Sequence, residues 1–360
     1  MKYILEILGG IKDTMSEKKY NVAVVGATGA VGQNIVKYLE EQPFPIGQLS
    51  LLSSKRSAGK KVTFHNKEIT IEEATESSFN SIDIAFFSAG GAISEKLVPS
   101  AVKSGAVVID NTSAYRMDEE VPLVVPEVNP EDLHKHKGII ANPNCSTIQM
   151  VAALKPIQEK YGLNRIIVST YQAVSGAGLA AQDELVAQTK QYLNDEEMEA
   201  NILPAGGDKR HYPIAFNALP QIDVFDDNDY TKEELKMINE TKKIMHAPDM
   251  KVAATCVRLP VFSSHAESVY VEVEGNPTVD QFKATIADGK GLILEDDPAT
   301  QTYPTPLSSE GKKEVFVGRI RQDLDVNNGF HLWIVSDNLV KGAAWNTVQI
   351  GQSLVEQKII

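Results

Sequence analysis

Cys145 is the residue whose chemistry and position most directly suggest catalysis. It lies in Asn142-Pro143-Asn144-Cys145-Ser146-Thr147, directly before the apolar, helix-forming segment 148–154. At the start of a helix, free backbone N–H groups and the helix dipole stabilise a thiolate, so we expect a lowered thiol pKa and a nucleophilic sulfur. A cysteine is also often a simple packing residue, and position alone leaves both interpretations open. For Cys256, inside the strand-like segment 252–259, we favour packing.

A glycine motif near the N-terminus indicates nucleotide binding. The motif lies between the apolar, β-branched run 20–25 and the segment 33–39, which has helical spacing. Glycines permit the tight turn and let backbone N–H groups approach a pyrophosphate at the helix N-terminus. Because a strand before and a helix after are the context that this motif requires, we expect a dinucleotide site rather than an ordinary turn. The candidate cofactor-binding residues of this loop are Gly26, Thr28, Gly29, Ala30, Val31 and Gly32.

The end of the next predicted strand indicates which dinucleotide is bound. The strand 48–52 is followed by Ser53-Ser54-Lys55-Arg56-Ser57, without an acidic residue. NAD sites usually carry an acid here for the ribose hydroxyls, whereas a guanidinium and hydroxyls suit a 2′-phosphate. We therefore expect NADP, bound through Ser54, Arg56 and Ser57. The alternative is that the two basic side chains are merely solvated.

The elements around these residues predict two different sheets. Apolar strands at 20–25, 48–52, 82–88 and 106–110 alternate with helix-like segments, which is typical of an α/β, doubly wound parallel sheet of the Rossmann type. From residue 166 the strands become longer, and several alternate apolar with polar residues. That pattern favours an α+β region with a mixed, largely antiparallel sheet that has one face on helices. We expect its strands at 166–171, 251–259, 268–274, 315–321 and 329–336, and a last helix at 342–354.

Length and composition exclude several classes of protein. The 360 residues suggest about two domains, and 42% hydrophobic residues exclude whole-chain disorder. A formal net charge of −13 argues against nucleic-acid or anionic-membrane partners, and no apolar run reaches the roughly 18 residues of a membrane span. The two cysteines form no disulfide framework or metal-ligand spacing. We therefore expect a cytoplasmic protein without a metal.

Several further segments give the sequence a resemblance to one family. They follow one another in the order Asp110–Arg116, Pro126–Asn129, Asn142–Thr147, Tyr171–Gly178, Cys256–Arg258 and Ser336–Asn338. Over about residues 20–358 the sequence resembles aspartate-β-semialdehyde dehydrogenase, and most closely the branch found in Gram-positive bacteria. The resemblance implies an NADP-binding Rossmann domain at 20–145, a catalytic and dimerisation domain at 146–340, and a C-terminal helix, 341–358, that packs back on the first domain. Residues 1–19 are left as an N-terminal extension.

The resemblance also implies a reaction and a set of roles. The reaction is the reversible, NADP-dependent reduction of L-4-aspartyl phosphate to L-aspartate 4-semialdehyde and phosphate through a cysteine thioester. It belongs to lysine, methionine, threonine and diaminopimelate biosynthesis, and the family's enzyme is a homodimer. Cys145 would be the nucleophile, His265 an acid–base group that titrates near neutral pH, and Asn144 would orient the thiol or the oxyanion. The remaining implied residues are Gln172, Glu233 and Arg258 for substrate, Arg116 and Lys236 for phosphate, and Ser175, Gly176 and Asn338 for NADP.

Three other functions remain as alternatives. N-acetyl-glutamyl-phosphate reductase shares the fold and the thioester chemistry, but its acylated substrate nitrogen needs no acid at Glu233. A non-catalytic NADP-binding regulator would not need Cys145 and His265. Glyceraldehyde-phosphate dehydrogenase fits poorly because an NAD enzyme favours an acid after the second strand.

Overall fold

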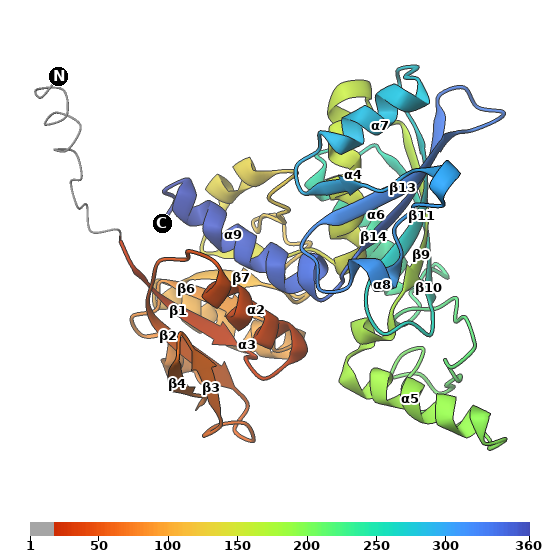
Figure 1. Ribbon diagram of the computed structural model, residues 1–360. Helices are drawn as coiled ribbons and strands as arrows, with labels where there is room; N and C mark the ends of the chain where they lie inside the picture. The colour runs from red at the N-terminus through yellow and green to blue at the C-terminus, as the bar shows by residue number, and fades with distance from the viewer. Residues whose placement is uncertain (1–17) are drawn as a thin grey trace, which may run out of the picture.

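The computed structural model describes residues 18–360, which form two lobes, each built on a six-stranded sheet (Figure 1). Most of the expected N-terminal extension, residues 1–17, lies outside the described residues. The sheet of the first lobe is parallel throughout, in the order β5-β2-β1-β6-β7-β8. Its strands are β1 (Tyr20–Val25), β2 (Ile46–Ser53), β5 (Glu72–Glu73), β6 (Ile84–Phe87), β7 (Val107–Asp110) and β8 (Ile139–Ala141).

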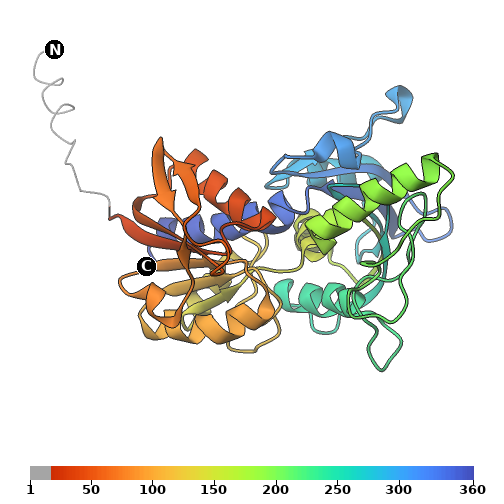
Figure 2. The same ribbon diagram turned by 90° about the horizontal axis from the view of Figure 1, so that it is seen from below.

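Helices on both faces explain why β1 is apolar from Val22 to Val25. Val22 and Val24 point into one core, whereas Ala23 and Val25 point into the other. Figure 2 shows α2 (Ala30–Glu41) and the C-terminal helix α9 (Trp345–Glu356) on one side of the sheet and α3 (Gly91–Lys103) on the other. The predicted doubly wound parallel sheet is confirmed. A small hairpin, β3 (Lys61–Phe64) and β4 (Lys67–Thr70), is added beyond it.

The second lobe contains the predicted mixed sheet, in the order β10-β9-β11-β14-β13-β12. The pairs β9/β10 and β12/β13 are parallel, and the other three pairs are antiparallel. The strand expected at 268–274 begins three residues earlier, because Ser264, with a φ of 69°, makes the turn that starts it. The strands are β9 (Arg165–Gln172), β10 (Lys251–Arg258), β11 (His265–Glu272), β12 (Leu292–Leu294), β13 (Val315–Gln322) and β14 (Gly329–Ser336).

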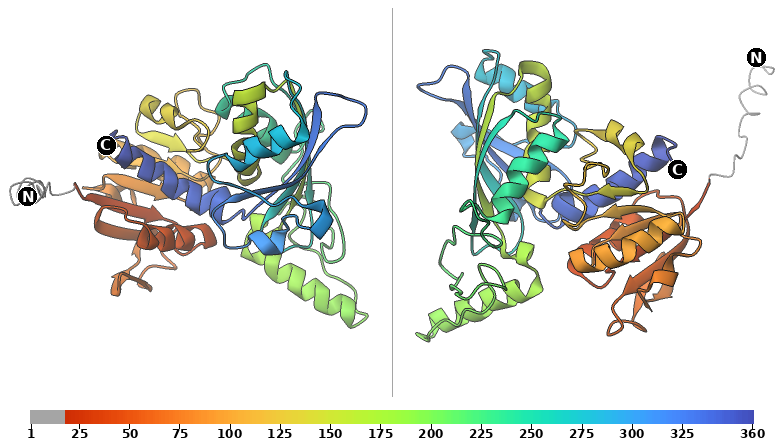
Figure 3. Two further views of the ribbon diagram at one scale, coloured as in Figure 1. Left: turned by 45° about the horizontal axis from the view of Figure 1, so that its top comes forward. Right: turned by 180° about the vertical axis from the view of Figure 1, so that it is seen from behind.

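One face of this second sheet is covered by helices, as Figure 3 shows from two sides. The covering helices are α4 (Cys145–Tyr161), α6 (Lys232–Ile244) and α7 (Val279–Ala287). On the opposite face, which we call the open face, Ile167 is 38% exposed and Tyr171, Tyr270 and Trp333 are half-buried. Helix α5 (Leu179–Leu193) projects from the end of this lobe, and the short α8 (Pro306–Ser309) lies against β14.

After β14 the chain returns to the first lobe. The helix expected at 342–354 is preceded by a π-helical turn, η5 (Val340–Ala344), and α9 begins only at Trp345. Val340, Val348 and Leu354 pack in the same core as β1 and α2. The Tyr20 hydroxyl donates a hydrogen bond to the Ile360 carbonyl at 2.8 Å. Among the described helices, none is both long and apolar enough to cross a membrane.

Candidate active site

A cleft of about 1120 Å³ between the lobes contains most of the predicted site residues. The glycine loop lines one side with Thr28, Gly29, Ala30 and Val31. Arg116 reaches the cleft from the loop after β7. The other predicted residues that line the cleft come from the second lobe and from the segments that join it to the first: Asn144, Cys145, Gln172, Ser175, Gly176, Glu233, Lys236, Arg258 and Asn338. His265 lies behind this lining and is fully buried.

Cys145 is the first residue of α4, as the sequence predicts. Asn144 caps that helix, because its side-chain oxygen accepts hydrogen bonds from the N–H groups of Ser146 at 3.0 Å and Thr147 at 3.3 Å. The π-helical turn η5 packs directly behind the thiol: a Cβ atom on Gly342 would lie 2.8 Å from the Cβ of Cys145. A glycine is therefore required where η5 passes the half-buried Cys145.

The expected lowering of the Cys145 pKa is wrong for the free protein. Burial, and then the negative charge of Glu233, raise the pKa of the Cys145 thiol to about 12. Arg116, Arg258 and the N–H of Ser146 act in the opposite direction but are outweighed. The helix terminus is present, but it stabilises a thiolate less than the cleft destabilises one.

Glu233 is the centre of the hydrogen bonds that surround Cys145. One carboxylate oxygen accepts from the Asn144 amide at 2.8 Å and the Gln172 amide at 3.1 Å, and the other accepts from Lys236 at 3.2 Å. Burial opposes ionisation, but Lys236 and these amides outweigh it and lower the pKa of Glu233 to about 2. Glu233 is therefore a fixed negative charge, and its spacing of three residues from Lys236 gives the ion pair on one helix face.

His265 is a neutral imidazole in this environment, which corrects the expectation that it titrates near neutral pH. Burial and the adjacent Arg258 lower the pKa of His265 to about 3. The backbone N–H of Ala173 donates to Nδ1 at 3.1 Å, so the ring proton resides on Nε2. The Nε2 atom has no hydrogen-bond partner among residues 18–360.

Two arginines keep donors free although both side chains are buried. Arg258 uses Nη1 for the Ala173 carbonyl at 2.7 Å, and its Nε has no partner among the described residues. Arg116 donates to the carbonyls of Asn142 and Asn111 at 2.9 and 3.0 Å and to Glu240 at 3.2 Å. Since a guanidinium has five N–H groups, each arginine can still bind an anion in a fixed orientation.

The residues expected around NADP lie in three places. Ser175 and Asn338 contact each other at 3.0 Å inside the cleft, beside Gly176. Gly26 and Gly32 are behind the cleft, and a Cβ on Gly32 would lie 2.1 Å from the Gly26 carbonyl oxygen, so the turn needs glycine there. Ser54 and Arg56 are exposed in the turn after β2, outside the cleft lining, and Ser57 is buried.

The sequence did not reveal the acidic residue beside the end of β2 or the acidic partners of Lys236 and Arg116. Glu73 of β5 pairs with Ser53, so an acid does lie beside the end of β2, contributed by a strand about twenty residues later. Asp223 binds Lys236 at 2.9 Å, and Glu240 binds Arg116. Glu240 is seven residues after Glu233, so a projection of the predicted helix would have placed it on the same face.

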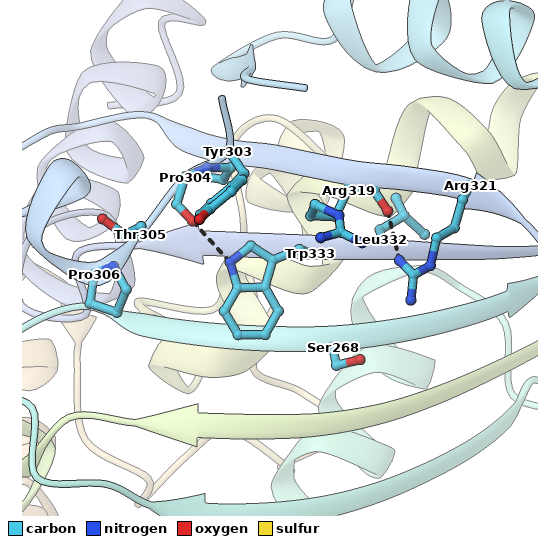
Figure 4. Close-up of a pocket in the computed structure, with 9 residues that line it drawn as sticks. All are labelled: Ser268, Tyr303, Pro304, Thr305, Pro306, Arg319, Arg321, Leu332 and Trp333. Carbon is cyan, nitrogen blue, oxygen red and sulfur yellow. Dashed lines mark hydrogen bonds between the residues drawn. The ribbon is translucent and has the colours of Figure 1, made fainter. Parts of the chain in front are cut away.

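A second, smaller hollow of about 350 Å³ lies on the open face, and Figure 4 shows its lining. The Trp333 indole donates to the Pro304 carbonyl at 3.0 Å, with Arg319 and Arg321 farther along the same face. None of the predicted site residues lines it.

A buried carboxyl group two residues after His265 yields a stability prediction. Glu267 is fully buried, neither of its oxygens has a hydrogen-bond partner among residues 18–360, and burial raises its pKa well above the usual range. The folded protein thus holds a proton that the unfolded chain loses above about pH 4.3, so this group's contribution to stability falls as pH rises from there. We expect the free energy of unfolding of Glu267→Gln, relative to that of the parent protein, to rise by about 1.4 kcal/mol per pH unit. This rise should continue until the pH reaches the pKa of Glu267 in the folded protein.

Denaturant unfolding of both proteins between pH 5.5 and 8 measures this difference. The exposed Glu68, changed to Gln, is the control and should show no such trend. A constant difference across this pH range would mean that Glu267 is ionised in the folded protein.

The comparisons with known proteins agree along nearly the whole chain. The family model described as semialdehyde dehydrogenase, NAD binding domain, matches residues 21–136, and the one described as semialdehyde dehydrogenase, dimerisation domain, matches residues 154–341. The aspartate-semialdehyde dehydrogenase of Bacillus subtilis is 63% identical over 341 residues, which are 94% of this chain and 99% of that protein. That of Aquifex aeolicus is 53% identical over 95% of this chain and 99% of its own length.

Solved structures show the same similarity. The crystal structure of aspartate semialdehyde dehydrogenase II from Vibrio cholerae has a TM-score of 0.90 at 47% identity, over 94% of this chain and 99% of that one. The same enzyme complexed with ASA gives 0.89, and the enzyme with NADP from Candida albicans gives 0.73 at 27% identity, over 95% of this chain and all of that one. The chain therefore belongs to the aspartate-semialdehyde dehydrogenase family of oxidoreductases.

Proposed function

We propose that this enzyme is NADP-dependent and reduces L-4-aspartyl phosphate reversibly to L-aspartate 4-semialdehyde through a thioester on Cys145. The observation that carries the proposal is the grouping of a helix-terminal thiol with a fixed carboxylate, Glu233, and with two buried arginines that keep free donors. A zwitterionic acyl phosphate needs these charges. The product semialdehyde would serve lysine, methionine, threonine and diaminopimelate biosynthesis.

The raised pKa of Cys145 fits activation by the substrate. An α-ammonium group bound to Glu233 would neutralise the charge that opposes the thiolate, while Arg116 and Arg258 continue to favour it. Arg258 would bind the α-carboxylate through its free donors, beside Gln172. Thiolate formation is then coupled to the binding of a substrate with both charged groups.

The covalent steps follow from these positions. In the oxidative direction the Cys145 thiolate would attack the aldehyde carbon to form a thiohemiacetal. Loss of hydride from that carbon would leave the thioester, and NADP, when bound, would supply the hydride acceptor. The Nε2–H of neutral His265 would donate a hydrogen bond to the substrate oxygen as negative charge develops there, and the helix-capping Asn144 would hold the thiol in place. Phosphate held by Arg116 and Lys236 then attacks the acyl carbon, and the thiolate departs.

The glycine loop and the cleft fit a dinucleotide. Gly29 and the start of α2 line the cleft, and the Ser175–Asn338 pair lines the same cleft as Cys145, where a nicotinamide would have to be. The Candida albicans structure named above contains NADP.

A spectrophotometric assay tests the proposed reaction. Purified protein is mixed with aspartate semialdehyde, phosphate and NADP, and absorbance of NADPH is followed. We expect phosphate-dependent NADPH formation. Activity with N-acetyl-glutamate semialdehyde instead would favour the reductase alternative and leave Glu233 without its proposed partner.

Arg56 yields a test of cofactor preference. Changing Arg56 to Ala should raise the KM for NADP about tenfold or more and leave that for NAD nearly unchanged, because only NADP carries the 2′-phosphate. Lys55→Ala is the matched control in the same turn. The measurement is steady-state kinetics with each cofactor. An equal loss with both cofactors would mean that Arg56 supports the loop and does not bind the 2′-phosphate. Because Glu73 lies beside the end of β2, NAD would then become a candidate cofactor.

We further propose a cytoplasmic homodimer that associates through the open face of the second sheet. The family model for this region is described as a dimerisation domain, and exposed Ile167 lies on that face with Tyr270 and Trp333. The assignment of residues 20–145 to the cofactor, 146–340 to catalysis and dimerisation, and 341–358 to the first domain belongs to the same proposal. Light scattering during gel filtration would give the mass of the particle in solution.

A further inference from the structure

Helix α6 carries two more charged side chains in line with Glu233 and Lys236. Glu240 and Lys243 continue the same spacing by one and two further turns. Glu240 is only 1% exposed and does not line the cleft. A carboxylate is costly to bury unless charged or hydrogen-bonding groups compensate it, so its partners are informative.

The two oxygens of Glu240 bind both parts of the proposed machinery. Oε1 accepts from the Arg116 guanidinium at 3.2 Å, and Oε2 accepts from the backbone N–H of Asn144 at 2.7 Å. Arg116 comes from the first lobe's loop after β7, whereas Asn144 caps the helix that begins with Cys145. One carboxylate thus fixes the phosphate-binding guanidinium relative to the nucleophile.

Lys243 holds only the arginine's loop. Its Nζ donates to the carbonyls of Arg116, Asp118 and Val121 at 2.8, 2.7 and 2.9 Å. Within residues 18–360, none of its hydrogen bonds reaches α4. The chain therefore offers a natural comparison between a residue that binds both parts and one that binds a single part.

We propose that Glu240 is a positioning residue for both covalent steps of the reaction, and that Lys243 is a positioning residue for the phosphate step alone. This inference rests on the proposed function. Displacement of Asn144 alters the start of α4 and hence the thiol, which affects thioester formation. Loss of Lys243 shifts the backbone of Arg116 and so misplaces phosphate relative to the acyl carbon, which affects acyl transfer. The guanidinium charge that favours the thiolate is still held by Glu240 in that case, so thioester formation is kept.

Rapid-mixing kinetics separates the two steps. With NADP and aspartate semialdehyde but no phosphate, the first turnover of NADPH reports thioester formation, and added phosphate reports acyl transfer. We expect Glu240→Gln to slow both by about tenfold or more, and Lys243→Met to keep the first turnover but raise the KM for phosphate. A second readout is the rate at which iodoacetamide alkylates Cys145, which Glu240→Gln should change and Lys243→Met should not.

The parent enzyme separates failure of this inference from failure of the proposed function. A first turnover in the parent protein supports the thioester, whatever the variants do. Normal first-turnover, phosphate and alkylation kinetics in Glu240→Gln would overturn the inference, as would an equally slowed first turnover in Lys243→Met. If thermal melting shows that Glu240→Gln does not fold, Glu240→Asp replaces it, because the shorter acid cannot reach both partners and the same outcomes decide.

Discussion

Cys145→Ala should abolish turnover, with a loss of about 10⁴-fold or more in kcat, while NADP still binds. The loss is large because the proposed reaction has no covalent intermediate without the thiol, and 10⁴-fold corresponds to about 5 kcal/mol of barrier. Steady-state assays and a fluorescence titration with NADPH measure the two quantities. Alanine also removes no contact that η5 needs, since Gly342 packs against the Cβ that alanine retains.

Cys256→Ala is the control for this experiment. Cys256 is fully buried in β10, where burial raises the pKa of its thiol, and it does not line the cleft. We expect lower stability but near-normal kcat from its loss. Near-normal kcat in Cys145→Ala would contradict the thioester mechanism for this enzyme.

The next largest effect should come from Arg258→Lys, with a loss of roughly 100-fold or more in kcat/KM for the semialdehyde. Arg258 already holds the Ala173 carbonyl at 2.7 Å and keeps its Nε free, whereas an ammonium is a point charge that cannot do both in one plane. A tilted substrate would present its carbonyl wrongly to Cys145. Kinetics with the semialdehyde varied at saturating phosphate give this value.

Lys236→Arg is the comparison at the other anion site. It keeps a cation between Asp223 and Glu233, so we expect a milder loss that appears mostly in the KM for phosphate. Suppose instead that Arg258→Lys changed only the phosphate KM, or Lys236→Arg only the semialdehyde KM. The two anion sites would then have to be exchanged in the proposal.

Local pattern was sufficient for the long strands of both sheets and for part of the site. The β-branched run 20–25 forms the expected strand, and the apolar segment after Cys145 forms the expected helix. Both elements are buried, and burial produces an apolar pattern that can be recognised in the sequence. The spacing of Glu233 and Lys236 likewise gave a contact within one helix. These are short-range relations, which periodicity describes directly.

What could not be predicted depends on chain segments that meet from far apart. The pKa of Cys145 is set by burial and by Glu233, which is 88 residues later, so a helix N-terminus alone gave the wrong direction. Glu240 contacts Asn144 across a sequence separation of 96 residues, and β5 brings Glu73 beside Ser53. Neither relation leaves a local signature in composition or spacing.

The return of α9 to the first lobe has a consequence for biosynthesis. Leu354 and Val348 fill the core under β1 and α2, so the first lobe lacks part of its interior until the ribosome has added about 200 residues beyond β8. At the usual 5–20 residues per second, that interval is roughly 10–40 seconds. During this time the apolar surface that α9 later covers is open to chaperones and to premature association, although the cofactor loop is already made. Maturation of the nucleotide-binding half thus waits for translation of the C-terminal helix.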